Sequence, residues 1–404
     1  MRKLPPVGTR LHWQELWAAL RETPDAEAIF AEALRERIPC EEVFFFGSGR
    51  AALAAILSAL RSIREGDRVI VPAYTCWSVP AAIVRAGMRV LPVDIKPGEI
   101  DYDFERLGQL DWRGVTAVVS PNLFGLPGDL DRLAALCQAH GATLIDDAAQ
   151  SLGASVGGRP VGSFGAAGIV SFGRGKNITA LGGGAALVRD EQLRAALAES
   201  ADAFRDGPAP SAWEVVAKGG AMSVALSPNL FALAEQLPGV EVGRTVFDPE
   251  FATPALGAAR AALGAAVLER LPELNKQRAN LVRWIDQILR SKKGVILPMP
   301  RTGAAPAWLR RPILTQEIGK RDALLAALIQ AGIGATAMYP DPVAAIKELE
   351  PDLDLRGAPF PGAKRFARSV IVLPLVESLT KEDLKALSHA VTDVMGKKVG
   401  ERWA

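Results

Sequence analysis

The sequence has few of the residues that several enzyme mechanisms require. Its 404 residues include 3 cysteines and 3 histidines. The cysteines are too few and too scattered for a disulfide framework or a zinc cluster, and a reducing cytoplasm suits them best. No histidine has the spacing of a metal-ligand motif or a catalytic triad. We therefore expect no metal and no Ser–His–Asp chemistry. The cysteines are Cys40, Cys76 and Cys137.

Net charge and long apolar runs are also scarce. With 47 basic and 45 acidic residues, the formal charge is +2, which gives no reason to expect nucleic acid or an anionic membrane as a partner. The N-terminus lacks the apolar core of a signal peptide. The most apolar stretch, 219–240, is interrupted by polar residues and by Pro228, so no membrane span of about 20 uninterrupted residues is expected. This stretch is interpreted as packed helices, or as a hydrophobic surface for a partner subunit, a lipid or an apolar substrate.

Short apolar runs alternate with helical patterns between about residues 43 and 190. Most runs are continuous, as is typical of parallel strands that are buried on both faces. Amphipathic stretches at 50–63 and 129–141 lie between the early runs. The pattern predicts an α/β domain around a mainly parallel sheet. The expected strands are 43–47, 67–73, 88–94, 116–122, 142–148, 167–172 and 184–189.

The pattern changes after about residue 200. Residues 204–250 show irregular helix with Pro and Gly breaks, and a long helical stretch follows, interrupted near Pro272. Sparse strands between two further helices complete the chain. We predict a large domain at 1–255, which includes an N-terminal helical segment and a variable helical insertion at 204–250, and a small C-terminal α/β domain at 256–404.

The segment GSGRAAL (47–53) joins the end of an expected strand to the start of a helix. Ligands bind at the carboxyl ends of strands in parallel α/β sheets. Glycines let the backbone approach an anion there, and the free N–H groups near Arg50 and Ala51 suit a phosphate. A tight turn without a ligand is the alternative interpretation.

The segment LIDDAAQ (144–150) places two adjacent acids at a strand end. Neighbouring strand side chains point to opposite faces, so only one of the acids can face a given site. A carboxylate with a small residue two positions on suits an aromatic heterocycle whose ring nitrogen stays protonated. A metal ligand or a helix cap are the alternatives.

The segment VSFGRGKNITALGGGAALV (170–188) carries Lys176 just after a strand, among glycines. It fails the pattern of a nucleoside-triphosphate loop, because Val170 replaces the first Gly and Asn177 replaces the Ser or Thr that holds Mg²⁺. Apolar surroundings lower the pKa of a lysine, and an amine needs a lowered pKa to attack a carbonyl. A solvated surface lysine is the alternative.

The segment VPAYTCWSVPAAI (71–83) ends a strand with Tyr74, Cys76 and Trp77. An aromatic ring there could stack on a planar cofactor or could pack as core. No G-x-G-x-x-G follows the first strand, so the dinucleotide-binding fingerprint is absent.

Taken in order, these four motifs resemble those of the sugar-nucleotide aminotransferases, the DegT/StrS group within the fold-type-I pyridoxal-phosphate (PLP) enzymes. The resemblance runs from about residue 40 to 200 and, more faintly, from 256 to 395. The stretches SPNLFGLPGDLDRLAALCQAHGATLIDDAAQSLGA and GRPVGSFG extend it. It implies a fold-type-I large domain with a seven-stranded sheet, PLP as cofactor, and a homodimer whose active site lies at the subunit interface.

The resemblance also implies a role for each matched residue. Lys176 would hold PLP as a Schiff base and later move the proton, and Asp147 would pair with the pyridinium nitrogen. Ala149 would lie against the ring, and Gln150 would reach the ring hydroxyl. The phosphate would be held by Ser171 and by the backbone at Gly49, Arg50 and Ala51.

Two departures from the group's pattern concern the cofactor side. Arg50 stands where Thr or another small residue is usual, and it could add a charge to the phosphate site. Cys76 replaces a common aromatic, so we expect stacking to pass to Trp77 or Tyr74. Cys76 and Trp77 are both included among the expected cofactor contacts.

Two further departures concern the substrate side. Residues 253–255, Thr-Pro-Ala, replace an Asn-Tyr-Arg stretch that reaches the neighbouring subunit's site in this group. Residues 338–340, Met-Tyr-Pro, replace His-Tyr-Pro. The substrate-side candidates are therefore Tyr339 and Thr253.

The implied function is PLP-dependent transfer of an amino group to a keto-sugar. Glutamate is the expected donor, and the sugar is expected to be nucleotide-linked. Lys176 favours amino transfer, because some relatives that lost the lysine perform dehydration. A PLP-dependent dehydratase, a PLP-binding regulatory protein without transaminase activity, and a nucleotide-binding α/β protein without PLP stay open as alternatives. The sequence identifies neither the acceptor sugar nor its stereochemistry.

Overall fold

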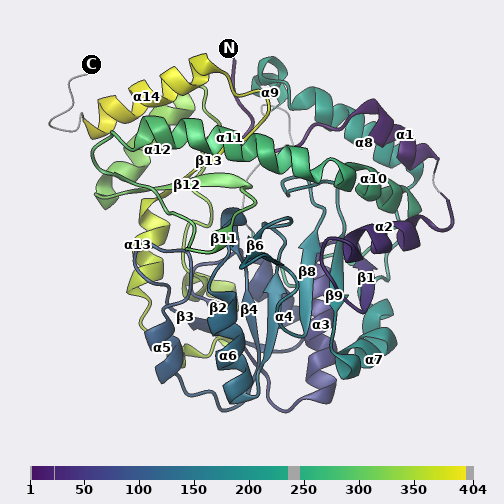
Figure 1. Ribbon diagram of the computed structural model, residues 1–404. Coiled ribbons are helices and arrows are strands. Elements are labelled where there is room, and N and C mark those ends of the chain that lie inside the picture. The colour runs from purple at the N-terminus through teal and green to yellow at the C-terminus, as the bar shows by residue number, and fades with distance from the viewer. Residues whose placement is uncertain (1, 22, 235–245, 397–404) are drawn as a thin grey trace.

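A seven-stranded sheet forms the centre of the protein, in the order β1-β9-β8-β5-β4-β2-β3. The computed structural model describes residues 2–21, 23–234 and 246–396 (Figure 1). Strand β9 is antiparallel to both of its neighbours, and the pairs from β8 to β3 are all parallel. Each of the seven expected strands is therefore present in one sheet. They are β1 (Glu42–Phe46), β2 (Arg68–Pro72), β3 (Arg89–Val93), β4 (Val115–Ser120), β5 (Thr143–Asp147), β8 (Ala167–Ser171) and β9 (Gly184–Val188).

Both faces of this sheet are buried, which explains the continuous apolar runs of the sequence. Successive residues of one strand enter two different hydrophobic clusters: Ile70 packs in one, and Val69 and Val71 in the other. Helix α3, rich in alanine and leucine, is buried along most of its length. The helices that accompany the strands are α3 (Gly49–Ile63), α4 (Ser78–Arg85), α5 (Phe104–Gln109), α6 (Leu130–His140) and α7 (Glu191–Ser200).

A group of helices covers the β1 side of the large sheet (Figure 1). Helix α10 packs against α1 and α2, and α8 packs against α1. The predicted break near Pro272 is confirmed, since α10 ends at Glu269 and Pro272 lies in the first turn of α11. The helices on this side are α1 (Trp13–Leu20), α2 (Ala26–Arg35), α8 (Ala212–Ala225) and α10 (Ala258–Glu269); α9 (Pro228–Ala234) follows α8, and α11 (Leu271–Leu289) follows α10.

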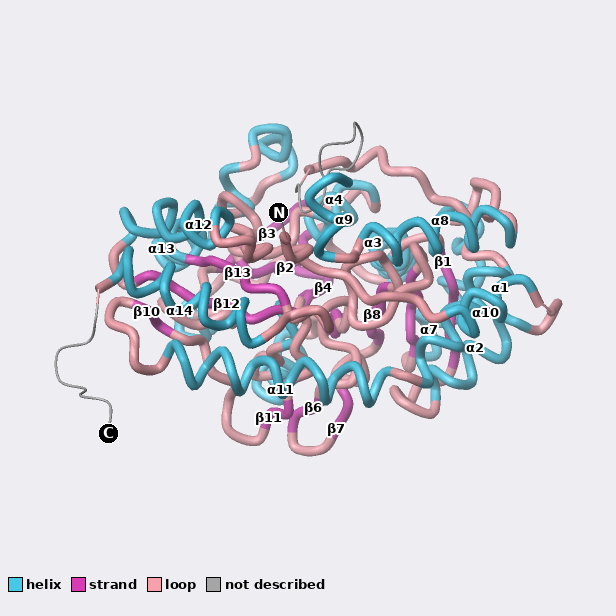
Figure 2. The backbone as a smooth tube through the Cα atoms, turned by 90° about the horizontal axis from the view of Figure 1, so that it is seen from above, coloured by secondary structure: helices cyan, strands magenta, loops and turns pink. Residues whose placement is uncertain are grey.

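The C-terminal part contains a smaller antiparallel sheet in the order β10-β12-β13. Helix α11 runs from the α10 region to this part (Figure 2). Three short strands, β6 (Ser155–Val156), β7 (Arg159–Pro160) and β11 (Ala304–Ala305), form a third sheet. The C-terminal elements are β10 (Val295–Ile296), β12 (Arg310–Thr315), β13 (Val370–Pro374), α12 (Arg321–Gln330), α13 (Pro361–Ser369) and α14 (Lys381–Met395). Short 3-10 turns are η1 (Leu123–Gly125), η2 (Ala201–Phe204), η3 (Ile318–Lys320), η4 (Val343–Ala345), η5 (Lys347–Asp352) and η6 (Leu355–Gly357).

The hydrophobic cores cross the predicted boundary at 255/256. Leu263 of α10 packs in a large-sheet core, whereas Ile285 of α11 packs in the core of the small sheet. Val343 returns to a large-sheet core, and Leu4 lies in the small-sheet core. The division at 255/256 stays a prediction, and the packing favours a division within α11.

The apolar stretch at 219–240 is described only as far as residue 234. Helix α8 packs Gly219 against Leu11 and Leu16 of the N-terminal segment, yet Val224 and Leu230 are exposed. Part of the stretch is therefore packed helix and part is surface. No helix within the described ranges is both long and apolar enough to cross a membrane.

Candidate functional site

Lys176 lies in the turn between β8 and β9, at the carboxyl end of β8. The turn is tied to the C-terminal part, because the Asn177 side-chain amide donates to the Ala307 carbonyl oxygen at 3.0 Å. Burial lowers the pKa of Lys176. Cys76 and Asp147 oppose this shift, and the charge of Arg310 adds to it. A lysine with a lowered pKa holds more neutral amine, the form that attacks a carbonyl.

Asp147 ends β5, the strand beside β8. Its Oδ1 accepts a hydrogen bond from the Ala149 N–H at 2.8 Å. Burial raises the pKa of Asp147 to about 6, against the opposing effects of that hydrogen bond and of the positive charge of Lys176. The sheet thus brings a buried carboxylate and the amine of Lys176 close enough to interact electrostatically.

Asp146 has different surroundings, as the strand geometry predicts for two successive acids. Its carboxylate accepts from the Asn122 side-chain amide at 2.9 Å and from the N–H groups of Gly162 and Phe164 at 2.5 and 3.1 Å. Burial raises the pKa of Asp146 to about 7, although these donors oppose the shift. Asp146 therefore organises the loop after β5, and Asp147 remains the acid beside Lys176.

The GSGRAAL turn leads from β1 into α3 and meets the end of β8. Ser48 caps the helix, and its Oγ accepts from the Ala51 N–H at 3.2 Å. Among the described residues, no acceptor bonds the N–H groups of Gly49 and Arg50. A Cβ at Gly49 would lie 2.8 Å from Cβ and 3.2 Å from Oγ of Ser171. The Ser171 hydroxyl and the free N–H groups of Gly49 and Arg50 can hold a phosphate. The Ala51 N–H already donates to Ser48.

The Arg50 side chain contacts Phe251 and Asp248. Its guanidinium lies 4.3 Å from the centre of the Phe251 ring, and Nη1 lies 3.4 Å from Asp248 Oδ2. Burial lowers the pKa of Arg50. The added charge that the sequence suggested for the phosphate site is therefore shared with Asp248.

The loop after β2 separates its three candidate residues. Tyr74 is core: its hydroxyl donates to the Met338 carbonyl oxygen, and its ring packs 4.7 Å from that of Phe366. Trp77 donates from Nε1 to the Asp341 carbonyl oxygen at 3.4 Å. The electrostatic influence of Cys76 reaches Lys176. Of the three, Cys76 is thus the residue with an electrostatic effect on the lysine, and both aromatic side chains donate to backbone carbonyl oxygens of the C-terminal part.

Gln150 connects the two parts of the chain. Its Oε1 accepts from the Phe124 N–H at 3.1 Å, and its Nε2 donates to the Tyr339 hydroxyl at 2.9 Å. Phe124 and Tyr339 both have positive φ, at 62° and 49°. Such backbone strain in bulky residues is concentrated at functional sites. Tyr339, a predicted substrate-side residue, therefore adjoins the predicted cofactor contact Gln150.

Thr253, the other substrate-side candidate, is buried, and its hydroxyl donates to the Asp206 carboxylate. The following residue, Pro254, lies against the GSGRAAL turn, where a Cβ at Gly47 would fall 2.2 Å from its carbonyl oxygen. Residues 253–255 thus pack against the turn. The Thr253 hydroxyl is already hydrogen-bonded to Asp206 of the same chain.

Sequence reasoning missed three buried polar residues around the site. Asn122 donates to the Asp147 carbonyl oxygen at 3.1 Å as well as to Asp146. Arg278 of α11 donates to the Asn177 carbonyl oxygen at 3.0 Å, and burial lowers its pKa to about 10. Arg310 begins β12 and is buried. Asn122 lies in the SPNLFG stretch that extends the resemblance, but nothing in that stretch indicated its role. Arg278 and Arg310 lie in no motif, and only the tertiary structure brings them to the turn that carries Lys176.

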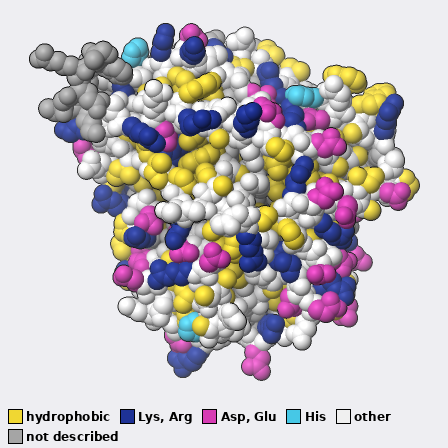
Figure 3. Space-filling view, viewed as in Figure 1, with side chains coloured by type: hydrophobic (Ala, Val, Ile, Leu, Met, Phe, Trp, Pro, Cys, Tyr) yellow, Lys and Arg dark blue, Asp and Glu magenta, His cyan; other side chains and the backbone are white. Residues whose placement is uncertain are grey.

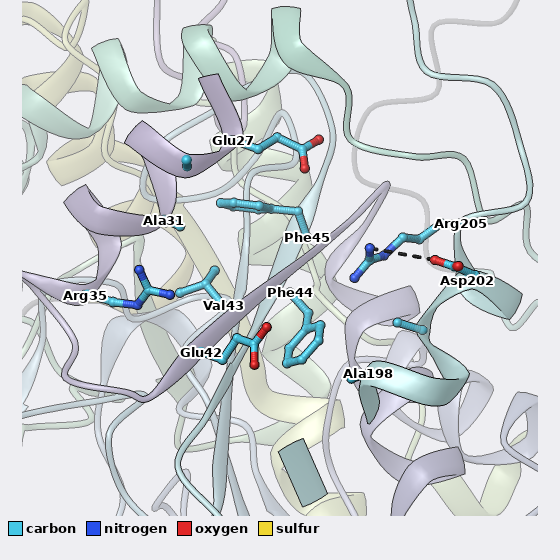
Figure 4. Close-up of a pocket in the computed structure, with 12 residues that line it drawn as sticks. Glu27, Ala31, Arg35, Glu42, Val43, Phe44, Phe45, Ala198, Asp202 and Arg205 are labelled. Carbon is cyan, nitrogen blue, oxygen red and sulfur yellow. Dashed lines mark ion pairs between the residues drawn. The ribbon is translucent and has the colours of Figure 1, made fainter. Parts of the chain in front are cut away.

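A surface hollow of about 400 Å³ lies away from these residues. It is lined from α2, β1, α7 and η2, and Figure 4 shows Glu42, Phe44 and Arg205 around it. Its charged residues include Arg205, which is 3.9 Å from Asp202. The hollow shares no residue with the Lys176 site, so we do not assign chemistry to it. On the face drawn in Figure 3, acidic and basic side chains are interspersed.

Comparison with known proteins agrees with the motif reading. A model of the DegT/DnrJ/EryC1/StrS aminotransferase family matches residues 20–206 and 255–392. The chain belongs to this aminotransferase family. One relative, the erythromycin biosynthesis sensory transduction protein EryC1 of Saccharopolyspora erythraea, is 29% identical over 91% of this chain and 88% of its own.

Solved structures share the fold over nearly the whole chain. Helicobacter pylori PseC, an aminotransferase involved in the biosynthesis of pseudoaminic acid, aligns with a TM-score of 0.78 at 20% identity, over 98% of this chain and 99% of its own. The Escherichia coli GDP-4-keto-6-deoxy-D-mannose-3-dehydratase with bound hydrated PLP aligns with a TM-score of 0.76 at 16% identity, over 97% and 100% of the two chains. This family member therefore has the fold-type-I architecture that the sequence predicted.

Proposed function

We propose that the protein is a PLP-dependent aminotransferase that moves an amino group from an amino acid, with glutamate as the expected donor, to a keto-sugar. The observation that carries the proposal is the meeting of Lys176 with Asp147 at the carboxyl ends of β8 and β5, beside the turn at Gly49. A partly buried amine, a buried carboxylate and a phosphate cradle are the three parts that PLP chemistry requires.

The residues present fit PLP. The Gly49 position has no room for a side chain beside Ser171, which is typical of a backbone that approaches a ligand closely. The free N–H groups of Gly49 and Arg50 stand at the N-terminus of α3 and suit the phosphate. PLP, when bound, acts as an electron sink for the bond that is broken at the donor carbon.

The chain's own residues divide the remaining work. Lys176 holds the cofactor and moves a proton at the reacting carbon through its amine. Asp147 keeps the ring nitrogen protonated, and Ala149 leaves space beside the ring. Gln150 holds Tyr339 at the border between cofactor and substrate. The rigid placement of these groups on strand ends supplies the orientation on which the rate depends.

The acceptor is proposed to be a nucleotide-linked keto-sugar. PseC is an aminotransferase involved in the biosynthesis of pseudoaminic acid, and the dehydratase with the same fold is named for GDP-4-keto-6-deoxy-D-mannose, a nucleotide-linked keto-sugar. The dehydratase is also the reason to keep dehydration as a second candidate. Lys176 favours amino transfer, because its amine would move the proton at the reacting carbon in both half-reactions.

The test is spectroscopic. Purified protein saturated with PLP should absorb as a yellow lysine-bound cofactor, and glutamate should remove this absorbance with release of 2-oxoglutarate. Addition of a nucleotide-linked keto-sugar should restore the absorbance and give the amino-sugar. The Lys176→Ala variant is the control and should show neither change.

The outcomes separate the candidates. Loss of water from the sugar without any response to amino donors would favour the dehydratase. A cofactor that stays unchanged with every common amino donor and every keto-sugar would favour a PLP-binding regulatory protein, in line with the name of the relative EryC1 as a sensory transduction protein. Protein that takes up no PLP would contradict the proposal as a whole.

A homodimer with the active site at its interface, and a cytoplasmic location, complete the proposal. The Gly49 turn and the Arg50–Asp248 pair lie next to residues 253–255, which stand in the place of the family's cross-subunit segment. Light scattering of the purified protein should give twice the mass of the chain; a monomer that retains PLP would exclude a shared site.

A further inference from the structure

Two successive arginines begin β12, and their surroundings differ. Arg311 donates to both Asp286 oxygens at 2.7 and 3.1 Å and to the Pro298 carbonyl oxygen at 2.6 Å. The Arg310 side chain has no hydrogen bond and no ion pair within residues 2–21, 23–234 and 246–396, and its Nε is buried without a partner, although only 9% of the residue is exposed. Neighbouring strand residues point to opposite faces of the sheet, so the two guanidinium groups lie in different surroundings.

Arg310 faces the turn that carries Lys176. Its Nη2 lies 3.3 Å from the position that a Cβ would take on Gly175, the residue before Lys176. The backbone just before Arg310 is fixed to the large domain, since the Leu309 N–H donates to the Phe124 carbonyl oxygen at 3.0 Å. Burial lowers the pKa of Arg310, while Tyr339 and Cys76 oppose the shift. These are the same neighbours that border the predicted cofactor site.

Two of the three cations around the turn have an acid that acts on them: Asp147 acts on Lys176, and Glu377 acts on Arg278. Arg310 has no such acid among the described residues, since the groups that act on it are Tyr339 and Cys76. An unpaired buried guanidinium costs free energy, and one with an unpartnered Nε calls for a functional explanation. Its planar fork matches a carboxylate through two parallel hydrogen bonds. The phosphate cradle at Gly49 and Ser171 already has its own donors.

We propose that Arg310 binds a carboxylate group of the amino donor and so places the donor amine at Lys176. This inference rests on the proposed aminotransferase function and names its donor class, amino acids with a free carboxylate. Tyr339, whose hydroxyl is held by Gln150, closes the same side of the site. Amines that lack a carboxylate gain nothing from Arg310, so the residue sets donor specificity.

The experiment uses the PLP-loaded protein and the variants Arg310→Gln and Arg310→Lys. Glutarate, a dicarboxylate without an amine, is titrated by calorimetry, and glutamate and propylamine are compared in single-turnover loss of cofactor absorbance. We expect Arg310→Gln to weaken glutarate binding and the glutamate reaction by about 10- to 100-fold, the effect of one lost charge-assisted pair. The propylamine reaction should change little, and Arg310→Lys should retain part of the effect.

Matched controls guard against a general defect. Arg301→Gln removes a partly exposed arginine that pairs with Asp101 and Asp129, and it should leave every value unchanged. Borohydride fixation of PLP should give the same cofactor content in all variants. An unaltered glutarate affinity in Arg310→Gln overturns the proposal, as does a site that a nucleoside diphosphate occupies through Arg310 in preference to glutarate.

The two proposals fail separately. If glutarate binds through Arg310 but no amino acid converts the cofactor, amino transfer fails and the carboxylate site stands. If glutamate converts the cofactor equally well in the unaltered protein and in Arg310→Gln, amino transfer stands and the role of Arg310 is wrong.

Discussion

The side-chain amide of Gln150 donates to the hydroxyl of Tyr339 at 2.9 Å. This bond joins the loop after β5, which carries the proposed cofactor contacts, to a C-terminal segment 189 residues away in sequence. Tyr339 holds a strained backbone, with φ at 49°, and its ring packs edge-on against Tyr74 at 5.8 Å. This buried hydrogen bond is therefore one of the contacts that fix the loop after β5 relative to the C-terminal part of the chain.

Tyr339→Phe should separate function from stability. The ring contact with Tyr74 survives, but Gln150 loses its acceptor, which should cost about 1 kcal/mol of unfolding free energy. We expect kcat/KM of the glutamate half-reaction to fall about tenfold, because the Tyr339 ring and the Gln150 amide no longer hold each other in position. Tyr74→Phe is the matched control: it removes a buried hydroxyl bonded to the Met338 carbonyl oxygen and should lower stability similarly with a smaller kinetic effect. Equal kinetic losses in the two variants would contradict this role for Gln150 and Tyr339.

Gly49→Ala should reduce the affinity for PLP. The added Cβ would lie 2.8 Å from Cβ of Ser171, so the turn must shift where the phosphate is proposed to bind. We expect at least a tenfold rise in the PLP dissociation constant, measured by fluorescence titration of the apoprotein, as one hydrogen bond or more is lost. Gly220→Ala, at a helix position with open space around it, is the control and should bind PLP normally. Unchanged affinity in Gly49→Ala would remove the phosphate from this turn.

The pH dependence of PLP capture should report the charges around Lys176. The neutral amine is the reactive form, so the capture rate rises with pH through the lysine pKa and then levels off. Burial lowers the pKa of Lys176, so the capture rate should level off at a lower pH than it would for a lysine with the ordinary pKa of 10.5. Asp147→Asn removes an anion that raises the pKa and should shift the profile to lower pH. Arg310→Gln removes a cation that lowers the pKa and should shift it to higher pH.

Stopped-flow absorbance of the apoprotein with PLP, from neutral to alkaline pH, measures these profiles. The pH dependence of PLP itself is common to all three proteins and cancels in the comparison. Two shifts in the same direction, or none, would show that the charges do not act on Lys176 as described.

Asp146→Ala should destabilise the protein through the loop after β5. Two buried backbone N–H groups, of Gly162 and Phe164, would lose their acceptor, whereas the Asn122 amide keeps carbonyl acceptors at Ser120 and Asp147. Unsatisfied buried donors cost about 1–3 kcal/mol each, so we expect a loss of about 2 kcal/mol or more in denaturant unfolding. A loss below about 1 kcal/mol would mean that the loop after β5 does not depend on Asp146.

The sequence predicted the large sheet well because its strands are continuous apolar runs. All seven runs form one sheet, and both faces are covered, so the local pattern and the tertiary packing agree. The same reasoning separated Asp146 from Asp147, because strand geometry alone sends neighbouring side chains apart. Motif spacing brought Lys176, Asp147 and Gly49 to one edge of the sheet, since that edge collects the carboxyl ends of parallel strands.

The remainder depends on contacts between distant segments. Nothing in the local sequence distinguishes Arg310 from Arg311, yet one is paired with Asp286 and the other is not. Tyr74 is an aromatic at a strand end, and only the presence of Phe366 and Met338 makes it core. Leu4 and Val343 likewise cross between the two parts of the chain, which a boundary drawn from local patterns cannot anticipate.

The attachment of PLP to Lys176 is the central claim, and covalent trapping tests it most directly. The purified protein is saturated with PLP, reduced with borohydride, digested and mapped by mass spectrometry. We predict one pyridoxyl group per chain, on the peptide that contains Lys176, and none at that position in Lys176→Ala. A pyridoxyl group on another lysine in the unaltered protein, or none at all, would contradict the account.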